Sequence, residues 1–416
     1  MVFFSFKVKD IKMYDVKEIR KDFPILSRSI EGKRNTFLDT AASAQKPQCV
    51  VDRMVTALTE QYANVHRGSY YLSEHLTFAY EQARKTVQRF INAASADEIV
   101  FTRNATESIN LVASTWGRKN LKPGDEVLIS EAEHHANLVT WQVLRDELGF
   151  TLKIFKIAND GSFVWNEFGG QLNKRTKLVA VTAMSNVLGT VFPIKKMAEA
   201  AHKYNALILV DACQFAVHGN IDVQDTDCDF LAFSGHKTYG PTGIGVLYGK
   251  YKLLEEMPPY QLGGEMVDTV TYEKTTFDVP PARFEAGTPA FVEAIGLGTA
   301  LEYMMTLGQK NIIEHERRLT AYATEALQNV KGLTLVGTAA DKGGVFSFVV
   351  EGMHPQDMAF ILSKEGVAVR TGHHCAEPLV RRMGYESVAR ASLGLYSNEE
   401  DIDMLVAAIN KAKTFF

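Results

Sequence analysis

The sequence contains few cysteines and no long hydrophobic run. Four cysteines, Cys49, Cys213, Cys228 and Cys375, are scattered over 416 residues and form no CxxC pair. Such usage predicts reduced thiols rather than a disulfide framework. No apolar run approaches the roughly 20 residues that span a bilayer. We therefore expect neither a disulfide-stapled nor a membrane-spanning protein.

Clusters of basic residues are lacking as well. The formal net charge is −4, from 45 Lys and Arg against 49 Asp and Glu, so a nucleic-acid partner has no electrostatic support. The N-terminal patch VFFSF has no basic segment before it, and lysines follow before a signal-peptide core could form. We expect a cytoplasmic protein with a disordered tail over residues 1–12, before a second Met at Met13.

Short apolar runs alternate with helical patterns over the middle of the chain. Runs that are apolar throughout and separated by helices predict a parallel-rich sheet covered on both faces. Ligands of such sheets collect at the carboxyl ends of the strands. The runs that we interpret as buried strands are EVLIS (126–130), KLVAVTAM (177–184), ALILVDA (206–212), FLAFS (230–234) and GVLYG (245–249).

The alternation defines an expected domain organisation. Residues 35–290 are predicted to form the large α/β domain, which closes with a Pro-, Gly- and Thr-rich segment that contains a hairpin. Residues 291–416 are expected to form a smaller α+β domain, with residues 13–34 packed against it. Ser397 and Glu400 have capping-box spacing before the last helix.

Polar residues at three predicted strand ends allow structural and functional interpretations. Asn104 to Glu107 open a helix, so they form a plain N-cap or a phosphate site at the positive end of the helix dipole. His134 is an ordinary histidine, a metal ligand or a ring stacked on a planar cofactor. Asp211 ends a very apolar strand and must be paired or solvated. It is an N-cap, a metal ligand or the partner of a protonated ring nitrogen.

The stretch FLAFSGHKTYGPTGIGVLYG (230–249) is the most informative one. It places Lys237 at the end of a buried strand, where a desolvated amine can form a Schiff base; the alternative is a lysine that reaches solvent. Ser234 and His236 could hold a phosphate beside it. With His134 and Asp211 these are the parts of a pyridoxal-phosphate site, whereas a metal site leaves Lys237 unexplained.

An ordered series of motifs carries a resemblance over nearly the whole chain. The sequence resembles the fold-type I pyridoxal-phosphate enzymes of the class V aminotransferase group, and more narrowly the group II cysteine desulfurases of the SUF iron–sulfur assembly system, relatives of selenocysteine lyases. The resemblance implies a seven-stranded α/β/α large domain and a smaller α+β C-terminal domain. The motifs include FLDTAASAQKP, NVHRGSYYLSE, TRNATESINLV, EAEHHANLV, SNVLGT, VDACQ, FEAGTP, RTGHHCAEPL and RASLGLY.

The resemblance also assigns roles to individual residues. Lys237 would bind pyridoxal 5′-phosphate covalently and move protons, while His134 stacks on its ring, Asp211 holds the ring nitrogen and Gln214 the ring oxygen. The implied phosphate-binding residues are Ala105, Thr106, Ser234, His236 and, from the other subunit of a homodimer, Thr288. The implied substrate-binding residues are Arg390, which would clamp a carboxylate with its planar guanidinium, Asn186, Arg370 and His66.

Cys375, in VAVRTGHHCAEPL, could be a metal ligand, a nucleophile or an inert loop thiol. Adjacent residues of an extended loop rarely converge on one ion, which disfavours zinc. The resemblance implies that Cys375 takes the sulfur of L-cysteine as a persulfide and passes it to a SUF acceptor protein. The thiolate would need a neighbouring cation, and His373, His374 and Arg370 are candidates. A selenocysteine lyase and a non-catalytic metal-binding or scaffold protein are the alternatives.

Overall fold

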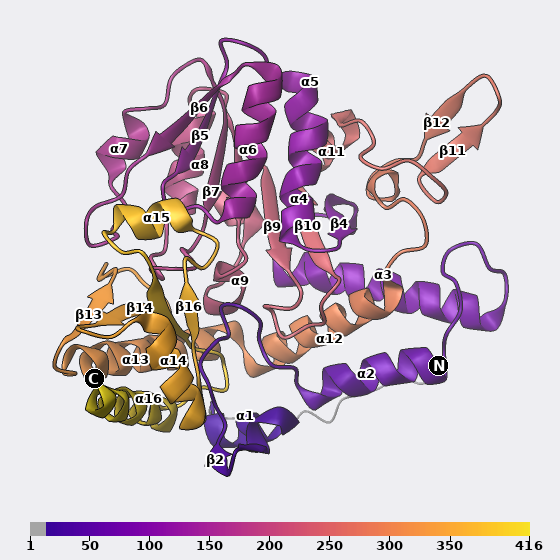
Figure 1. Cartoon of the computed structure of the whole chain (residues 1–416). Coiled ribbons are helices and arrows are strands. Elements are labelled where there is room, and N and C mark those ends of the chain that lie inside the picture. The colour runs from indigo at the N-terminus through magenta and orange to yellow at the C-terminus, as the bar shows by residue number, and fades with distance from the viewer. Residues whose placement is uncertain (1–13) are drawn as a thin grey trace.

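The computed structural model describes residues 14–416, so the predictions for residues 1–12 and Met13 lie outside it. A large sheet wrapped by helices forms one part of the molecule, and a smaller sheet with its own helices forms the other, which carries the C-terminus (Figure 1). Within residues 14–416 no helix is long and apolar enough to cross a membrane.

The large sheet has seven strands, which follow the apolar runs of the sequence: β4 (Ile99–Thr102), β5 (Glu126–Ser130), β6 (Thr151–Phe155), β7 (Thr176–Thr182), β8 (Leu207–Asp211), β9 (Phe230–Ser234) and β10 (Gly245–Gly249). Their order is β4-β10-β9-β8-β7-β5-β6. The pairs β5–β6, β5–β7, β7–β8 and β8–β9 are parallel. This confirms the predicted parallel-rich α/β sheet.

One strand runs against the others. β10 is antiparallel to both β4 and β9. The segment Gly235–Ile244 returns the chain directly beside β9, and it is too short for the crossover that a parallel neighbour needs. The same tight return sets the position of Lys237, which lies within it.

Helices and short turns surround this sheet: α2 (Gln48–Thr59), α3 (Tyr71–Phe90), η2 (Ala96–Glu98), α4 (Ala105–Val112), η3 (Ala113–Gly117), α5 (Arg118–Asn120), α6 (His135–Leu148), α7 (Trp165–Gly169), α8 (Ile194–His202), α9 (Phe215–His218), α10 (Val223–Thr226), α11 (Tyr251–Glu256) and α12 (Phe291–Leu307). Leu128 of β5 packs into a core shared with α3, α8 and α12. Val127 and Ile129 pack into a second core shared with α4 and α6. Because side chains alternate along a strand, both faces of the sheet are buried.

The smaller sheet has the order β13-β14-β17-β16 and is antiparallel throughout. Helices α13, α14 and α16 share one hydrophobic core with it. The bounds are β13 (Leu333–Val336), β14 (Val345–Val350), β16 (Arg370–Gly372), β17 (Val388–Ser392), α13 (Gln309–Gln328), α14 (Pro355–Lys364), α15 (Glu377–Arg382), α16 (Glu399–Ala412) and η5 (Lys413–Phe415).

The cap of the last helix differs from the prediction. We expected a capping box of Ser397 and Glu400, but the box consists of Asn398 and Asp401, each side chain accepting the other's backbone N–H. The Ser397 hydroxyl instead accepts the N–H of Gly394 at 3.0 Å and closes the preceding turn. Its engagement there shifts the start of α16 by one residue.

The N-terminal segment contacts the C-terminal part of the molecule. Strand β3 pairs in parallel with β15, which leads into the Cys375 loop. Arg20 of α1 forms an ion pair with Asp401 of α16 at 2.8 Å. The bounds are α1 (Val16–Lys21), η1 (Pro24–Ser27), β1 (Ser29–Ile30), β2 (Lys33–Arg34), β3 (Thr36–Phe37) and β15 (Val367–Ala368).

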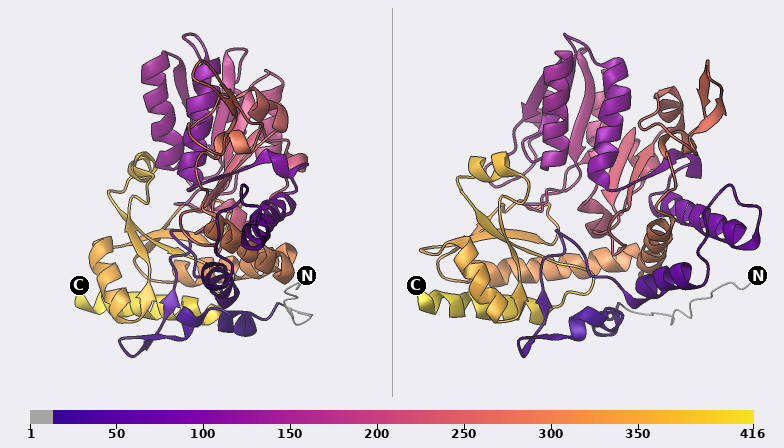
Figure 2. Two further views of the ribbon diagram at one scale, coloured as in Figure 1. Left: turned by 90° about the vertical axis from the view of Figure 1, so that its right-hand side faces the viewer. Right: turned by 45° about the vertical axis from the view of Figure 1, so that its right-hand side comes forward.

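A hairpin of β11 (Val267–Val270) and β12 (Thr275–Phe277) projects from the body of the molecule in Figure 1 and in the right view of Figure 2. It lies in the Pro-, Gly- and Thr-rich segment where the sequence indicated a hairpin, and η4 (Ala282–Phe284) follows it. Tyr272 at its tip is fully exposed, and Val270 and Leu262 are largely exposed.

Candidate active site

A cavity of about 220 Å³ opens where the carboxyl ends of the large-sheet strands meet the smaller sheet. Both parts of the chain contribute to its walls. The predicted site residues that line it are Ala105, Thr106, His134, Asn186, Asp211, Gln214, Ser234, His236, Lys237, Arg370, Cys375 and Arg390.

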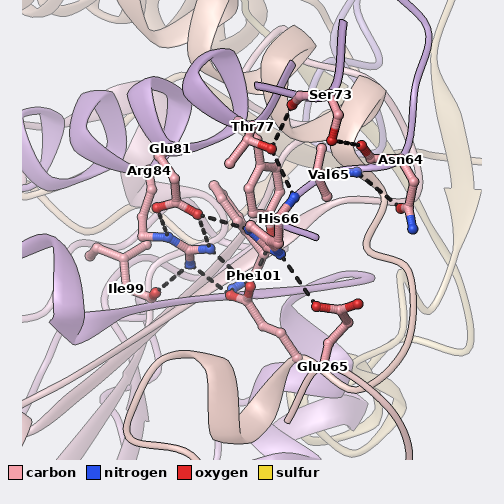
Figure 3. A network of polar contacts seen from close by, with 12 residues as sticks. Asn64, Val65, His66, Ser73, Thr77, Glu81, Arg84, Ile99, Phe101 and Glu265 are labelled. Atoms are coloured by element: carbon pink, nitrogen blue, oxygen red, sulfur yellow. Dashed lines mark hydrogen bonds and ion pairs between the residues drawn. The ribbon is translucent and has the colours of Figure 1, made fainter. Parts of the chain in front are cut away.

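Two predicted site residues lie elsewhere. Thr288 does not line the cavity. His66 lines a second cavity of about 160 Å³ with Glu81, Glu265 and Pro289. In Figure 3 its ring lies between these carboxylates, with Nε2 at 3.4 Å from Glu81 and Nδ1 at 3.8 Å from Glu265. His66 therefore lies outside the cavity that contains Lys237, and its contact with substrate stays a prediction.

The N-terminus of α4 forms one end of the cavity. Asn104 is the N-cap, and its side chain accepts the N–H of Glu107 at 2.9 Å, while the N–H of Ala105 is bound by the Ser234 hydroxyl at 2.9 Å. The loop packs directly on β10, because a Cβ on Gly245 would lie only 2.4 Å from the Cα of Asn104. The structural N-cap and a helix N-terminus facing the cavity thus coexist.

Two half-buried histidines beside Lys237 are neutral. Burial, and then the charge of Lys237, lower the pKa values of His134 and His236 to about 4. The Nδ1 atom of His134 accepts the N–H of Ala136 at 3.1 Å, so this ring caps α6 at the end of β5. The Nδ1 atom of His236 lies 3.2 Å from the Ser43 hydroxyl.

Asp211 is the last residue of β8 and is 5% exposed. Its Oδ1 atom accepts the N–H of Cys213 at 2.9 Å. Among residues 14–416 it has no ion-pair partner within 4 Å. A carboxylate buried in this way favours a cation placed in the cavity beside it.

Arg390 lies on the opposite wall and is 2% exposed. Its Nη1 atom donates to the carbonyl of Asn186 at 2.9 Å, and Nη2 lies 3.3 Å from Asp39. The Nε atom is buried without a hydrogen-bond partner. Such a guanidinium has donor capacity left for an anionic group that enters the cavity.

Cys375 is the exposed cysteine among the four; Cys213 and Cys228 are buried and Cys49 is half-buried. His374 beside it is buried, and burial followed by the Arg390 charge lowers its pKa to about 3. His374 is therefore neutral and supplies no positive charge to the thiol. No three His, Cys, Asp or Glu side chains converge on a common point within the described range.

Several contacts of the site were not visible in the sequence. Lys46 donates to the carbonyl of His236 at 2.9 Å, next to Lys237, and burial lowers its pKa to about 8. Gln214 donates to the carbonyl of Ala41 at 2.9 Å. His135, adjacent to the predicted His134, contacts the Cys375 loop. Of these residues, only His135 could have been found from the sequence, because it lies in the EHHAN motif beside His134.

The residues fit pyridoxal 5′-phosphate. An amine, a buried carboxylate without a counter-charge, a neutral ring and a helix N-terminus with adjacent hydroxyls share one cavity. A protonated ring nitrogen suits Asp211, and a phosphate suits the N-terminus of α4. These features are those of a pyridoxal-phosphate site on an aminotransferase-like fold.

The comparisons with known proteins agree with this class. The chain belongs to the class V aminotransferase family, whose model matches residues 36–405. It is 48% identical over 402 residues to a cysteine desulfurase of Dickeya dadantii, covering 96% of this chain and 97% of the relative. It is 46% identical over 401 residues to a cysteine desulfurase of Synechococcus elongatus, covering 96% of this chain but only 64% of that longer protein.

Solved structures show the same fold. The cysteine desulfurase CsdA of Escherichia coli superposes with a TM-score of 0.90 at 37% identity, covering 97% of this chain and all of that one. An apo cysteine desulfurase of Thermococcus onnurineus gives a TM-score of 0.91 at 36% identity, covering 96% and 98% of the two chains. The fold is therefore fold-type I, as the sequence predicted.

Proposed function

We propose that this chain is a cysteine desulfurase, which converts L-cysteine to L-alanine and retains the sulfur as a persulfide on Cys375. One observation carries the proposal: the exposed Cys375 and the amine of Lys237 line the same cavity, although 137 residues separate them in the sequence. The similarity to cysteine desulfurases of several organisms supports it.

Lys237, Asp211 and His134 form the cofactor side of the proposed reaction. Lys237 would hold pyridoxal phosphate covalently, and its Nζ atom would take the α-proton of the substrate. Asp211 would keep the ring nitrogen protonated, and the neutral His134 would contact the cofactor ring. The bound cofactor supplies an electron sink that acidifies the α-carbon. Ala105, Thr106, Ser234, His236 and Gln214 hold the remaining polar groups of the cofactor.

Arg390 and Asn186 form the substrate side. The free Nε of Arg390 and its fixed plane suit the α-carboxylate of an amino acid. The backbone carbonyl of Asn186 accepts a hydrogen bond from Nη1 of Arg390. The side-chain amide of Asn186 donates a hydrogen bond to the carbonyl of His374 at 2.7 Å. It thus aligns the carboxylate clamp with the Cys375 loop.

Sulfur transfer takes place at Cys375. The thiolate attacks the sulfur of the bound cysteine, an S–S bond forms and the C–S bond breaks, and its electron pair goes to the β-carbon, which is protonated to give alanine. Because His374 is neutral, we assign activation of the thiol to the guanidinium groups of Arg370 and Arg390, which line the cavity with it. L-Selenocysteine fits the same groups, and relative rates on the two amino acids define the preference.

We propose a homodimer that passes sulfur to an acceptor protein of the SUF type for iron–sulfur cluster assembly. Thr288 and His66 lie outside the cavity of their own chain, as residues that serve a second copy would. Exposed apolar side chains on α2 (Val51, Val55 and Leu58) support a protein–protein contact there.

Alanine formation tests the proposal. Purified protein with bound cofactor is incubated with L-cysteine and a thiol reductant, and alanine and sulfide are measured. Equal amounts of both support a desulfurase. Absence of alanine, with cofactor bound, would contradict the proposal and reopen other amino acids as substrates.

A further inference from the structure

The loop that carries Cys375 has an unusual backbone. His374 and Cys375 have φ angles of 53° and 58°, in the left-handed region that non-glycine residues seldom adopt. Two successive residues of this kind need contacts that hold them. Within the loop, the N–H of Ala376 binds the carbonyl of His373 at 2.9 Å.

His135 makes two of the three hydrogen bonds that join residues 374–377 to the large-sheet part of the described chain. Its backbone N–H donates to the carbonyl of Cys375 at 2.7 Å. Its ring Nε2 atom accepts the N–H of Glu377 at 3.1 Å. The third bond is from Asn186 to the carbonyl of His374. The two bonds of His135 therefore flank Cys375 in the chain.

These bonds satisfy two helix N-termini at once. His135 is the first residue of α6 and Glu377 the first of α15, and such positions have N–H groups without a partner inside the helix. The N-cap of α15, Ala376, makes no side-chain cap bond. The His135 ring, from the other part of the molecule, takes that place.

We propose that His135 is a positioning residue for sulfur transfer: its unprotonated Nε2 atom caps α15 and so fixes Cys375 against the wall that carries Lys237. The inference rests on the proposed persulfide chemistry of Cys375. His135 touches neither substrate nor cofactor in this role; it acts through the position of the loop.

Two substitutions at His135 distinguish the loss of the hydrogen-bond acceptor from the loss of the ring. His135→Phe keeps a flat ring without an acceptor. His135→Gln places an amide oxygen near the position of Nε2 and keeps the acceptor. His354→Phe is the matched control, because the His354 ring also accepts an N–H at a helix start, that of Gln356 at 3.2 Å, but it lies on α14 outside the cavity.

Hydrogen exchange of the cofactor-bound protein, read by mass spectrometry, and steady-state kinetics on L-cysteine form the test. His135→Phe should speed exchange at residues 374–378 and lower kcat about tenfold, with KM and cofactor absorbance unchanged, because one hydrogen bond to the loop is lost. His135→Gln should stay within about threefold of wild type in both readouts, and His354→Phe should leave kcat unchanged.

Three results would overturn the inference: unchanged exchange in His135→Phe, faster exchange with unchanged kcat, or a His135→Gln variant as impaired as His135→Phe. If the wild-type protein produces no alanine, the proposed function fails. Exchange at residues 374–378 then decides the role of His135 by itself.

Discussion

The two walls of the cavity are built in different ways. Asp211, His134 and Lys237 lie at or just after the ends of strands that are buried on both faces. Cys375 lies in an exposed loop with a left-handed backbone, held by a few hydrogen bonds. The first wall provides side chains at fixed positions for a cofactor. The second provides a thiol that lines the cavity and is exposed to solvent, as the proposed sulfur carrier requires.

The largest effect should come from the cofactor wall. Lys237→Ala removes the amine that binds the cofactor and moves the α-proton, so turnover should fall about 10³-fold or more. The fold should persist, because Lys237 lies at the edge of the core. Alanine production measures the turnover, and circular dichroism measures whether the fold persists. Activity within tenfold of wild type would show that another residue does this work.

Cys375→Ala should affect sulfur transfer without affecting cofactor binding. The variant should keep cofactor absorbance and binding but lose persulfide, and alanine production should fall roughly a hundredfold, because the sulfur has no acceptor. Cys49→Ala is the control on a half-buried thiol outside the cavity and should behave as wild type. Equal loss of cofactor binding in Cys375→Ala would mean that the two walls are not independent.

Arg390→Ala should weaken use of the substrate. Loss of a contact to a charged group costs about 1.5–3 kcal/mol, so kcat/KM should fall about tenfold to a hundredfold. Arg390→Lys should recover only part of this, because an ammonium cannot present the same planar donors. An unchanged kcat/KM in Arg390→Ala would remove this residue from the substrate side.

The smallest effect concerns Glu133, which is buried under the cofactor wall and bound by Asn137 at 2.7 Å and the N–H of Thr182 at 3.0 Å. Burial, with a further contribution from Asp211, raises its pKa to about 8. A folded-state pKa above the unfolded value of about 4.3 means that its contribution to stability is present below pH 4 and is lost as pH rises through 8.

Glu133→Gln removes this titration. The apparent Tm of wild type should therefore fall relative to that of the variant by about 2–4 °C between pH 5 and pH 9. Differential scanning fluorimetry at both pH values measures the change. A constant Tm difference would show that Glu133 does not change protonation in this range.

The sequence predicted the strands of the cofactor wall well because local patterns define them. The apolar runs 126–130, 230–234 and 245–249 became strands with those bounds. Because β5 and β9 run in the same direction, the polar residues that follow these two strands share one edge of the sheet. The direction of β10 could have been predicted only by comparing the length of the connection after β9 with the longer crossover that a parallel strand needs. The position of the α16 capping box was not predicted, because the Ser397 hydroxyl accepts the N–H of Gly394 in the preceding turn.

Contacts between distant segments could not be predicted. The bond from Lys46 to the carbonyl of His236 and the cap that His135 provides for α15 join residues about 190 and 240 positions apart, and no periodicity encodes them. His66 lies in a second cavity, where its ring contacts Glu81 and Glu265 (Figure 3). The sequence spacing of polar residues indicates candidate site residues, whereas tertiary packing determines which of them come into contact.

The mass of the intact, denatured chain after incubation with L-cysteine tests the central claim most directly. We predict a gain of one sulfur atom that a reductant removes and that is absent from Cys375→Ala. Alanine formed without any sulfur added to Cys375 would contradict the account and would indicate direct release of sulfur from the substrate.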